Sequence, residues 1–429
     1  MQLFGTSGIR AIADESLARL AFKLGLVVGK VYGNVVVGGD TRTSTEAMKH
    51  SLVSGLLFAG GNCCDAGVIP TPTLAFAARE FDAGAMITAS HNPPEYNGLK
   101  LFNPDGSAFD ADQRQQIEEA VRDDSFSVAP WSEIKSSRLY NRAVEQHIER
   151  IQQDFPTGLK LKVVVDSGCG ATSLVTPHLL TRLGCEVVAI NCYHSGFFPR
   201  DAEPIESNLS DLMKATREAG ADLGIAHDGD GDRMMVVDEK GRFVPGDRLL
   251  AIFARELGAK EVVTTIDASM AIEEMGFKVR YTKVGDTYVS EELKRGGDFG
   301  GEPSGSWVFP KLSLCPDGIY AAARITAIAR QQKLSALVDS IPSYPLLRGS
   351  IRSNRVVLFN LEQQLMTMNP LSVGKVDGIK LNFEDSWLLV RPSGTEPKIR
   401  LTVEAKSERA ARQLFDSAVR LVKTSTEGK

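Results

Sequence analysis

Three short β-branched segments at wide spacing set the main limit on how this chain of 429 residues can fold. Each ends in an aspartate and small residues and is followed by a helix-permissive stretch; they are Val35–Asp40, Val163–Gly168 and Val262–Asp267. Continuous apolar runs of this kind are typical of strands buried in parallel sheets, and ligand-binding groups gather at the carboxyl ends of such strands. The segments lie roughly 100 to 130 residues apart, which is too far for a solenoid repeat. They predict three α/β domains of similar plan.

The last ~80 residues follow a different pattern, with short strand-like runs before one long amphipathic segment. The expected strands are Val356–Phe359, Ile379–Phe383, Trp387–Val390 and Ile399–Glu404, and a closing helix is expected from about Ser407. A small sheet with helices on one side is the natural fourth domain. We therefore expect an α/β protein of three similar mixed α/β domains and a smaller C-terminal α+β domain, with limits at residues 1–153, 154–247, 248–344 and 345–429.

Charge and composition exclude several classes of protein. A net charge of −5 argues against nucleic acid as a general partner, so any anionic ligand needs local cationic contacts. No stretch approaches the ~20 uncharged apolar residues of a membrane span, and the start of the chain carries early charges. The six cysteines include no pair with CxxC spacing, which favours buried thiols over metal sites or disulfides. We expect a cytoplasmic protein without a membrane partner.

A serine loop is the sharpest local motif. The apolar run Ala83–Thr88 predicts a buried strand, and Pro93 and Pro94 prevent helix or strand from continuing beyond it. Ser90 is expected to lie exposed at the carboxyl end of that strand, where reacting groups belong. A serine hydroxyl is a weak nucleophile that needs a base, a metal or a cation, and the local candidates are His91 and Lys100. A polar turn that happens to contain Ser-His is the alternative.

A run of alternating aspartates and glycines predicts a metal site. Asp228, Asp230 and Asp232 can turn three carboxylate oxygens toward one point, an arrangement that suits a hard divalent cation such as Mg²⁺. An EF-hand does not fit, because Arg233 stands where that loop requires glycine and the strand-like run Met234–Val237 follows. A solvated acidic turn fits poorly between two apolar runs.

Three further motifs carry polar chemistry. Arg391–Thr395 combines an arginine, two hydroxyls and an exposed glycine backbone, which are the parts of a phosphate cradle. Gly300–Gly305 holds a carboxylate and a hydroxyl that suit vicinal sugar hydroxyls, and Phe4–Arg10 places small polar residues before an arginine; plain turns remain open for both. A metal, a nucleophile and a separate phosphate cradle together indicate phosphoryl transfer with a phosphorylated substrate.

Taken together, the motifs resemble those of the α-D-phosphohexomutase superfamily, over Phe4 to Arg400. They occur in the order of that family: the serine loop, the aspartate loop, the Gly301–Gly305 loop and the Arg391–Thr395 loop. One short match arises easily by chance, whereas the ordered set is highly specific. The resemblance implies an isomerase of carbohydrate metabolism with four domains around a central active-site cleft, which receives one loop from each.

The resemblance also implies roles for individual residues. Ser90 would carry the phosphoryl group as a phosphoserine, making the enzyme a phosphoprotein, and its phosphate and the three aspartates would hold one Mg²⁺. Lys100 would be an acid/base partner with His91 beside the serine, while Arg10 and the substrate-binding Arg233 would offset charge. Contacts to the sugar and to its non-reacting phosphate would come from Glu302, Ser304, Arg391, Ser393, Gly394 and Thr395.

The reaction so implied interconverts the 6-phosphate and 1-phosphate of a hexose or hexosamine. A sugar 1,6-bisphosphate would serve as intermediate and activator, and the partner would be a small-molecule sugar phosphate. The sequence leaves the oligomeric state open, a homo-oligomer included.

At two positions the sequence differs from the usual pattern of the family, and both bear on which sugar is bound. Ser306 and Trp307 follow Gly305 where many relatives have histidine, and Gly285-Asp286 stands where hexose-preferring members often have Gly-His. An acidic residue there favours a protonated amino group, and the loops look most like those of archaeal phosphoglucosamine mutases, which is the preferred hypothesis. The alternatives are a phosphomannomutase or phosphoglucomutase, a metal-dependent sugar phosphatase and, more distantly, a non-catalytic sugar-phosphate sensor.

Overall fold

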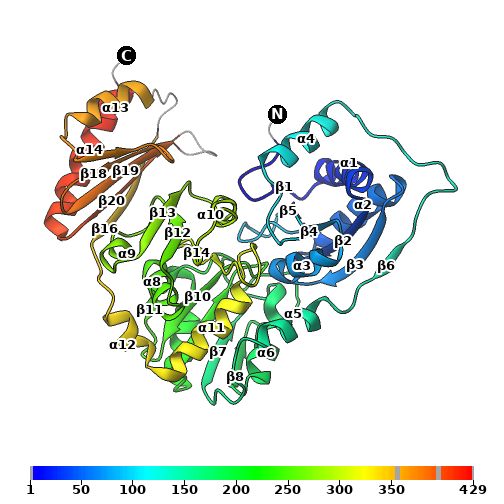
Figure 1. Ribbon diagram of the computed structural model, residues 1–429, viewed down its shortest axis with the longest axis horizontal. Coiled ribbons are helices and arrows are strands. Elements are labelled where there is room, and N and C mark those ends of the chain that lie inside the picture. Colours follow the sequence, from blue (N-terminus) through cyan, green and yellow to red (C-terminus); the bar gives the residue numbers. More distant parts are fainter. Residues whose placement is uncertain (1–2, 353–357, 393–397, 428–429) are drawn as a thin grey trace.

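The computed structural model describes residues 3–352, 358–392 and 398–427, and its strands form four sheets across this part of the chain. Three of the sheets mix parallel and antiparallel strands and lie among helices, whereas the C-terminal sheet is wholly antiparallel (Figure 1). This arrangement confirms the predicted fold class. The limits of the four domains stay a prediction.

The first sheet has the strand order β1-β5-β4-β2-β3-β6, with the first β-branched segment at its centre as β2 (Asn34–Gly39). Val35 and Val37 face the cluster made with α1, α2 and α4, while Val36 faces the cluster on the other side of the sheet, with α3. This alternation produces three layers because successive side chains of a strand point to opposite faces. The other elements are β1 (Ile9–Ile12), α1 (Glu15–Tyr32), α2 (Thr45–Phe58), β3 (Asn62–Val68), α3 (Thr71–Ala77), β4 (Ala83–Ile87), β5 (Tyr96–Phe102), α4 (Ala111–Arg122), β6 (Ser137–Leu139) and α5 (Ala143–Gln152).

Helices α1 and α2 approach each other closely through two glycines. A Cβ at Gly25 would lie 2.2 Å from the carbonyl oxygen of Leu52, and one at Gly55 would lie 2.1 Å from that of Phe22. Only glycine fits at such a contact. The pair therefore covers one face of the first sheet as a single tight layer.

The second sheet has the order β11-β10-β9-β7-β8, and β7 (Lys162–Asp166) carries the second β-branched segment. Strands β8 and β9 run parallel to β7, and β10 runs antiparallel to β9. The other elements are α6 (Thr176–Arg182), β8 (Glu186–Ile190), α7 (Ser210–Glu218), β9 (Leu223–His227), β10 (Met234–Asp238) and β11 (Phe243–Val244).

The third sheet has the order β13-β12-β14-β15, with the third β-branched segment in β12 (Glu261–Thr265). Val262 belongs to one apolar cluster shared with the second sheet, whereas Val263 packs with Val289 and Leu293 of α10. The second and third parts of the molecule therefore share a continuous core. The elements are α8 (Gly246–Glu256), α9 (Ala271–Glu274), β13 (Lys278–Thr282), α10 (Asp286–Leu293), β14 (Phe299–Gly301), β15 (Trp307–Val308), α11 (Gly318–Gln331) and α12 (Leu334–Asp339).

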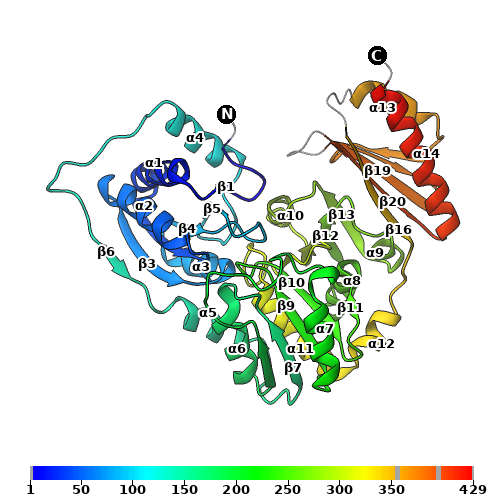
Figure 2. The ribbon, with the colours of Figure 1, turned by 180° about the vertical axis from the view of Figure 1, so that it is seen from behind.

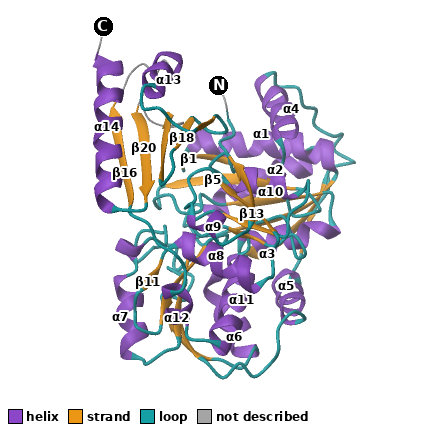
Figure 3. Ribbon diagram, turned by 60° about the vertical axis from the view of Figure 1, so that its left-hand side comes forward, coloured by secondary structure: helices purple, strands orange, loops and turns teal. Residues whose placement is uncertain are grey.

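The C-terminal sheet has the order β16-β20-β19-β18-β17, and α14 lies alongside β16 and β20 (Figure 3). Leu388 and Val390 pack with the helices α13 and α14, while Trp387 and Leu389 on the other face pack with Ile266 of the third domain. Figure 2 shows the same placement beside β13 and α9 from behind. The elements are β16 (Leu346–Arg352), α13 (Leu358–Met366), β17 (Ser372–Gly374), β18 (Ile379–Asn382), β19 (Ser386–Pro392), β20 (Lys398–Ala405) and α14 (Glu408–Glu427).

One strand prediction in this domain is wrong. The expected strand Val356–Phe359 ends in Leu358 and Phe359, which begin helix α13, while residues 356 and 357 lie outside the described part. A short apolar run does not distinguish a strand from a buried helix segment. The other three strands and the closing helix are confirmed.

The three mixed sheets present their motifs in the same way. The serine loop joins β4 to β5, the aspartate loop joins β9 to β10, and the Glu302 loop joins β14 to β15. In each case the first strand is parallel to the strand that carries the β-branched segment, and the second strand returns antiparallel. The candidate site is thus built from three equivalent hairpin loops.

Candidate active site

The serine loop and the aspartate loop meet directly. The hydroxyl of Ser90 donates a hydrogen bond to Oδ2 of Asp228 at 2.7 Å, across 138 positions of sequence. A Cβ at Gly229 would lie 2.6 Å from the carbonyl oxygen of Ser90, so the backbones approach as closely as glycine allows. The two strongest motifs of the sequence therefore form one cluster.

Ser90 is buried, with 1% of its surface exposed, and the expectation that it lies exposed is wrong. The aspartate loop packs over it, and this covering loop comes from another domain, which local sequence does not reveal. The φ angle of Ser90 is +52°, in the left-handed region, which is uncommon outside glycine. Its amide donates to Oγ1 of Thr88 at 2.9 Å. A strained backbone held by surrounding contacts is typical of functional sites.

Arg42 shapes the serine loop and is absent from the predicted site. It is 3% exposed and its guanidinium donates to Oδ2 of Asp40 at 3.1 Å. It also donates to four carbonyl oxygens of the loop, those of Ser90, Asn92, Pro93 and Tyr96, at 2.6 to 2.9 Å. Burial raises the pKa of Asp40, although Arg42 beside it acts in the opposite direction. The only sequence signal was its place two residues after the aspartate that ends β2.

The three aspartates form a buried cluster suited to a cation. Ligand oxygens of Asp228, Asp230 and Asp232 lie within 4.8 Å of one another, and each residue is at most 4% exposed. Burial and then the neighbouring carboxylates raise the pKa of Asp228. Oδ1 of Asp230 is buried without a hydrogen-bond partner among the described residues. Hard oxygen donors with an unsatisfied atom fit a divalent cation such as Mg²⁺.

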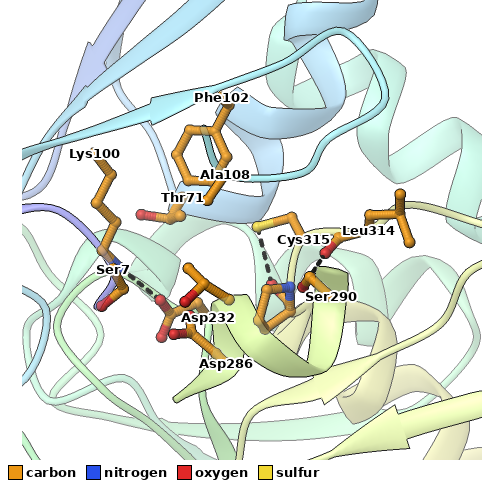
Figure 4. Close-up of a pocket in the computed structure, with 12 residues that line it drawn as sticks. Ser7, Thr71, Lys100, Phe102, Ala108, Asp232, Asp286, Ser290, Leu314 and Cys315 are labelled. Carbon is orange, nitrogen blue, oxygen red and sulfur yellow. Dashed lines mark hydrogen bonds and ion pairs between the residues drawn. The ribbon is translucent and has the colours of Figure 1, made fainter. Parts of the chain in front are cut away.

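Lys100 reaches into this cluster from β5. Its ammonium donates to Oδ2 of Asp230 at 2.7 Å and to Oδ2 of Asp232 at 2.5 Å. Burial would lower the pKa of Lys100, but the two carboxylates raise it above its ordinary value. Figure 4 shows Lys100 pointing to Asp232 at a pocket that Asp286 also lines. Lys100 therefore forms ion pairs with two of the predicted metal ligands rather than a contact with Ser90.

The other predicted residues near the serine differ in their contacts. Nδ1 of His91 lies 3.3 Å from Oγ of Ser90, and burial, followed by Arg233 and Arg10, lowers the pKa of His91 to about 2. Arg10 donates to Oδ1 of Asn92 in the serine loop at 3.0 Å. Arg233 forms an ion pair with Glu203 at 3.0 Å. All three therefore lie around the same cluster.

Glu302 directly follows β14, at the start of the third hairpin loop. Its Oε1 accepts the backbone N–H of Gly285 at 2.7 Å, and its Oε2 lies 3.3 Å from the hydroxyl of Ser304. Burial raises the pKa of Glu302 to about 7, with Asp286 adding to the effect. The backbone of this loop also touches the aspartate loop, because the amide of Met234 donates to the carbonyl of Gly305 at 2.9 Å.

The fourth predicted loop is described only at its first residues. Arg391 lies on β19 and pairs with Asp377 at 3.0 Å, and within the described residues it has no hydrogen bond or ion pair with the Ser90 cluster. The predicted phosphate contacts Ser393, Gly394 and Thr395 lie outside the described residues.

Comparison with known proteins places the chain in a family. Four domain families match it in succession: the three α/β/α domains of phosphoglucomutase/phosphomannomutase over residues 1–128, 138–241 and 245–344, and the C-terminal domain over 356–421. The chain belongs to the phosphoglucomutase/phosphomannomutase family. This confirms the resemblance to the α-D-phosphohexomutases, and the protein is an enzyme of that class.

Individual members of this phosphohexomutase family match along almost the whole chain. A probable phosphoglucosamine mutase of Methanococcoides burtonii is 45% identical over 99% of both chains, and a phosphoglucosamine mutase of Methanocaldococcus jannaschii is 42% identical over 98% of both. The crystal structure of a phosphoglucomutase/phosphomannomutase family protein from Burkholderia thailandensis superimposes with a TM-score of 0.90 at 29% identity, covering 100% of this chain and 98% of that one. Among the described helices, none has the length and apolar character needed to cross a membrane.

Proposed function

We propose that the protein is a phosphoglucosamine mutase, which interconverts glucosamine 6-phosphate and glucosamine 1-phosphate. The observation that carries the chemistry is the hydrogen bond from the buried Ser90 hydroxyl to Asp228 of the acidic cluster. Support for the sugar comes from the archaeal relatives named phosphoglucosamine mutase at 40–46% identity over nearly the full chain.

Ser90 is proposed to carry the phosphoryl group as a phosphoserine. In the first half of the reaction the bond from phosphorus to Oγ of Ser90 breaks as the bond from phosphorus to the free sugar hydroxyl forms. The hydroxyl proton ends on Oγ of Ser90, with Lys100 as the proposed shuttle and His91 as a hydrogen-bond partner of the serine. The resulting 1,6-bisphosphate turns over in the cleft, and its other phosphoryl group returns to Ser90 by the reverse exchange.

Asp228, Asp230 and Asp232 are proposed to hold one Mg²⁺ together with the phosphoserine. When bound, the ion stabilises negative charge on the transferring phosphoryl group. Arg10 and Arg233 are proposed to offset the remaining charge, since both lie beside the serine loop or the aspartate loop. The enclosure of Ser90 supports this chemistry because a phosphoserine must be kept from water.

Glu302 and Ser304 are proposed to contact the sugar hydroxyls, and Arg391, Ser393, Gly394 and Thr395 to grip the non-reacting phosphate. Asp286, which lines the pocket beside Lys100, is proposed to favour a sugar with a protonated amino group. The carboxylate that Asp286 contributes to this pocket supports a cationic sugar over a neutral one.

The test is a coupled assay of the purified protein with Mg²⁺ and a trace of sugar 1,6-bisphosphate. Glucosamine 6-phosphate, glucose 1-phosphate and mannose 1-phosphate are compared by kcat/KM. We expect a preference for the amino sugar of at least tenfold, corresponding to roughly 1.4 kcal/mol of discrimination. Equal or greater kcat/KM for a neutral hexose would refute the proposed sugar, and release of inorganic phosphate without isomerisation would refute the mutase mechanism.

A further inference from the structure

One carboxylate oxygen joins the C-terminal domain to the third domain. Asp377 lies in the turn between β17 and β18, and its Oδ2 pairs with Nη2 of Arg391 at 3.0 Å. The same oxygen accepts the backbone N–H of Val284 at 3.1 Å. Asp377 therefore holds both an arginine of its own domain and a peptide group of the loop that precedes α10.

The next peptide group along that loop is held by the predicted sugar contact. The N–H of Gly285 donates to Oε1 of Glu302 at 2.7 Å, so adjacent amides of Val284 and Gly285 bind the carboxylates of Asp377 and Glu302. Gly285 has a φ of +141°, which favours glycine and fixes how the two amides point. A continuous chain of contacts thus runs from Arg391 to Glu302.

The turn that carries Asp377 fits closely against Arg391. Gly378 has a φ of +78°, and a Cβ there would lie 2.7 Å from Cβ of Arg391. The side chains of Arg391 and Asp377 are 22% and 21% exposed, so the pair is only partly open to water. Nε of Arg391 is buried without a hydrogen-bond partner among the described residues. Asp377 thus fixes the guanidinium at Nη2 while the described residues leave Nε without an acceptor, which suits an arginine that receives an anion.

We propose that Asp377 is a positioning residue that orients Arg391 for the non-reacting phosphate and couples that contact to the sugar contact at Glu302. The proposal rests on the function proposed above. A phosphate that binds the other nitrogen atoms of Arg391 meets a guanidinium that Asp377 holds through Nη2, and Asp377 in turn shares the Val284–Gly285 segment with Glu302. Binding of the phosphate and of the sugar ring are therefore linked, and the linkage is reciprocal.

The first test measures ligand binding without turnover. Titration calorimetry of glucosamine 6-phosphate, and separately of glucose 6-phosphate, compares Asp377→Ala with a matched control in the Ser90→Ala background. Asp385→Ala is the control, since Asp385 lies in the same domain, is 61% exposed and pairs with Lys406. We expect Asp377→Ala to weaken binding of the preferred sugar phosphate about tenfold, with Asp377→Asn between it and the wild-type residue, and Asp385→Ala to change nothing. Binding by Asp377→Ala within twofold of the control overturns the proposal.

The second test separates coupling from general damage. Glu302→Gln and Asp377→Ala are combined, and the weakening of binding in the double variant is compared with the product of the single effects. Coupling through the Val284–Gly285 segment predicts a double effect smaller than the product, whereas an effect equal to the product overturns the coupling. In otherwise wild-type enzyme, Asp377→Ala should raise KM more than it lowers kcat.

Failure of the proposed function has a different signature. A preference for glucose 6-phosphate in the Ser90→Ala control would refute the sugar assignment and leave the Asp377 test intact with that ligand. Absence of binding by either sugar phosphate would overturn both proposals.

Discussion

The serine loop is held in place chiefly by Arg42 and by the contact between Ser90 and Asp228. One cation satisfies four carbonyl oxygens and a buried carboxylate, so the loop keeps a conformation that its own residues would not adopt alone. The Ser90 hydroxyl is therefore positioned by residues from two other segments, one in its own domain and one in the next.

Ser90→Ala should abolish mutase activity, because it removes the hydroxyl that is proposed to carry the phosphoryl group. The fold should persist with a loss of about 1 kcal/mol, since the variant removes one buried hydrogen bond to a carboxylate. The coupled assay and thermal unfolding measure the two effects. Ser44→Ala, at the N-cap of α2 without a side-chain cap, is a serine control that should keep its activity. Residual turnover above a thousandth of wild type in Ser90→Ala would contradict the mechanism.

Arg42→Ala should destabilise the protein by about 3 to 5 kcal/mol, because it leaves the carboxylate of Asp40 buried without its cation. Activity should fall further than stability explains, since the loop carbonyls also lose their donor. Chemical denaturation and kcat at a temperature where the variant is folded provide the measurements. Arg19→Ala, in an exposed pair with Glu15, is the matched control and should change stability little. An active, stable Arg42→Ala variant would show that the loop holds its own shape.

At the residue scale the sequence predicted which side chains lie together in the candidate site better than how they are held. Ser90, Lys100 and the three aspartates could be found from the sequence, because glycine and proline residues stand close to these polar side chains. Arg42 could not be found in this way, because it donates to backbone carbonyl oxygens, which every residue has. The burial of Ser90 was likewise out of reach, since the covering loop lies 138 positions away.

At the scale of elements, a half-buried acidic group at a helix start shapes the response of the protein to pH. Asp247 stands in the first turn of α8 and accepts the backbone N–H of Ser269 at 2.7 Å. Burial, with nearby Glu404 and Asp267 adding to the effect, raises the pKa of Asp247 to about 7. The helix therefore begins with a carboxyl group that resists ionisation in the folded state.

Asp247→Asn should raise the melting temperature at pH 8 relative to the native protein. An unfolded aspartate ionises near pH 4 while the folded one stays protonated until about pH 7, so the native protein loses stability as pH rises through that window. The difference should be absent at pH 4 and constant above pH 7, at about 1 kcal/mol after allowing for partial exposure. Thermal scans across pH 4 to 9 measure it. Asp211→Asn, at the same position of the exposed start of α7, should show no such trend.

Elements with a clear period were predicted well, and short ones were not. The β-branched segments became β2, β7 and β12 because continuous apolar runs have few other uses inside a sheet. Strand β16 was missed because Leu346–Arg352 mixes glycine and arginine into its run and is only half buried. The start of α13 was taken for a strand because its apolar run is short. In both cases the contacts with the rest of the C-terminal domain decide whether the segment forms a strand or a helix.

At the scale of the whole molecule, the C-terminal domain is docked on the third domain through buried polar contacts. Glu404 accepts hydrogen bonds from the hydroxyl of Ser269 at 2.5 Å, the amide of Met270 at 2.8 Å and Nε1 of Trp387 at 2.8 Å. The ammonium of Lys380 donates to the carbonyl of Ile266 at 2.8 Å. These contacts lie beside the apolar patch of Trp387 and Leu389 and hold the C-terminal sheet against the third domain.

Glu404→Ala should loosen this docking, because it leaves three donors for which the described residues offer no other acceptor. We expect a larger radius of gyration in small-angle scattering and faster proteolysis near the segment between α12 and β16. Glu408→Ala, at the exposed start of α14, serves as the control. Identical scattering profiles for the two variants would show that the apolar patch alone holds the domains together.

In the three equivalent hairpin loops, the strands provide a common scaffold and the residues of each loop provide its polar side chains. The same strand pair recurs in three sheets with a different loop each time: one loop holds Ser90, one holds the three aspartates and one holds Glu302. The loops differ in chemistry, whereas the strand pairs below them share one geometry. A substitution in one loop therefore leaves the strand pairs of the other two sheets in place, so the polar residues of a single loop can change while the core is kept.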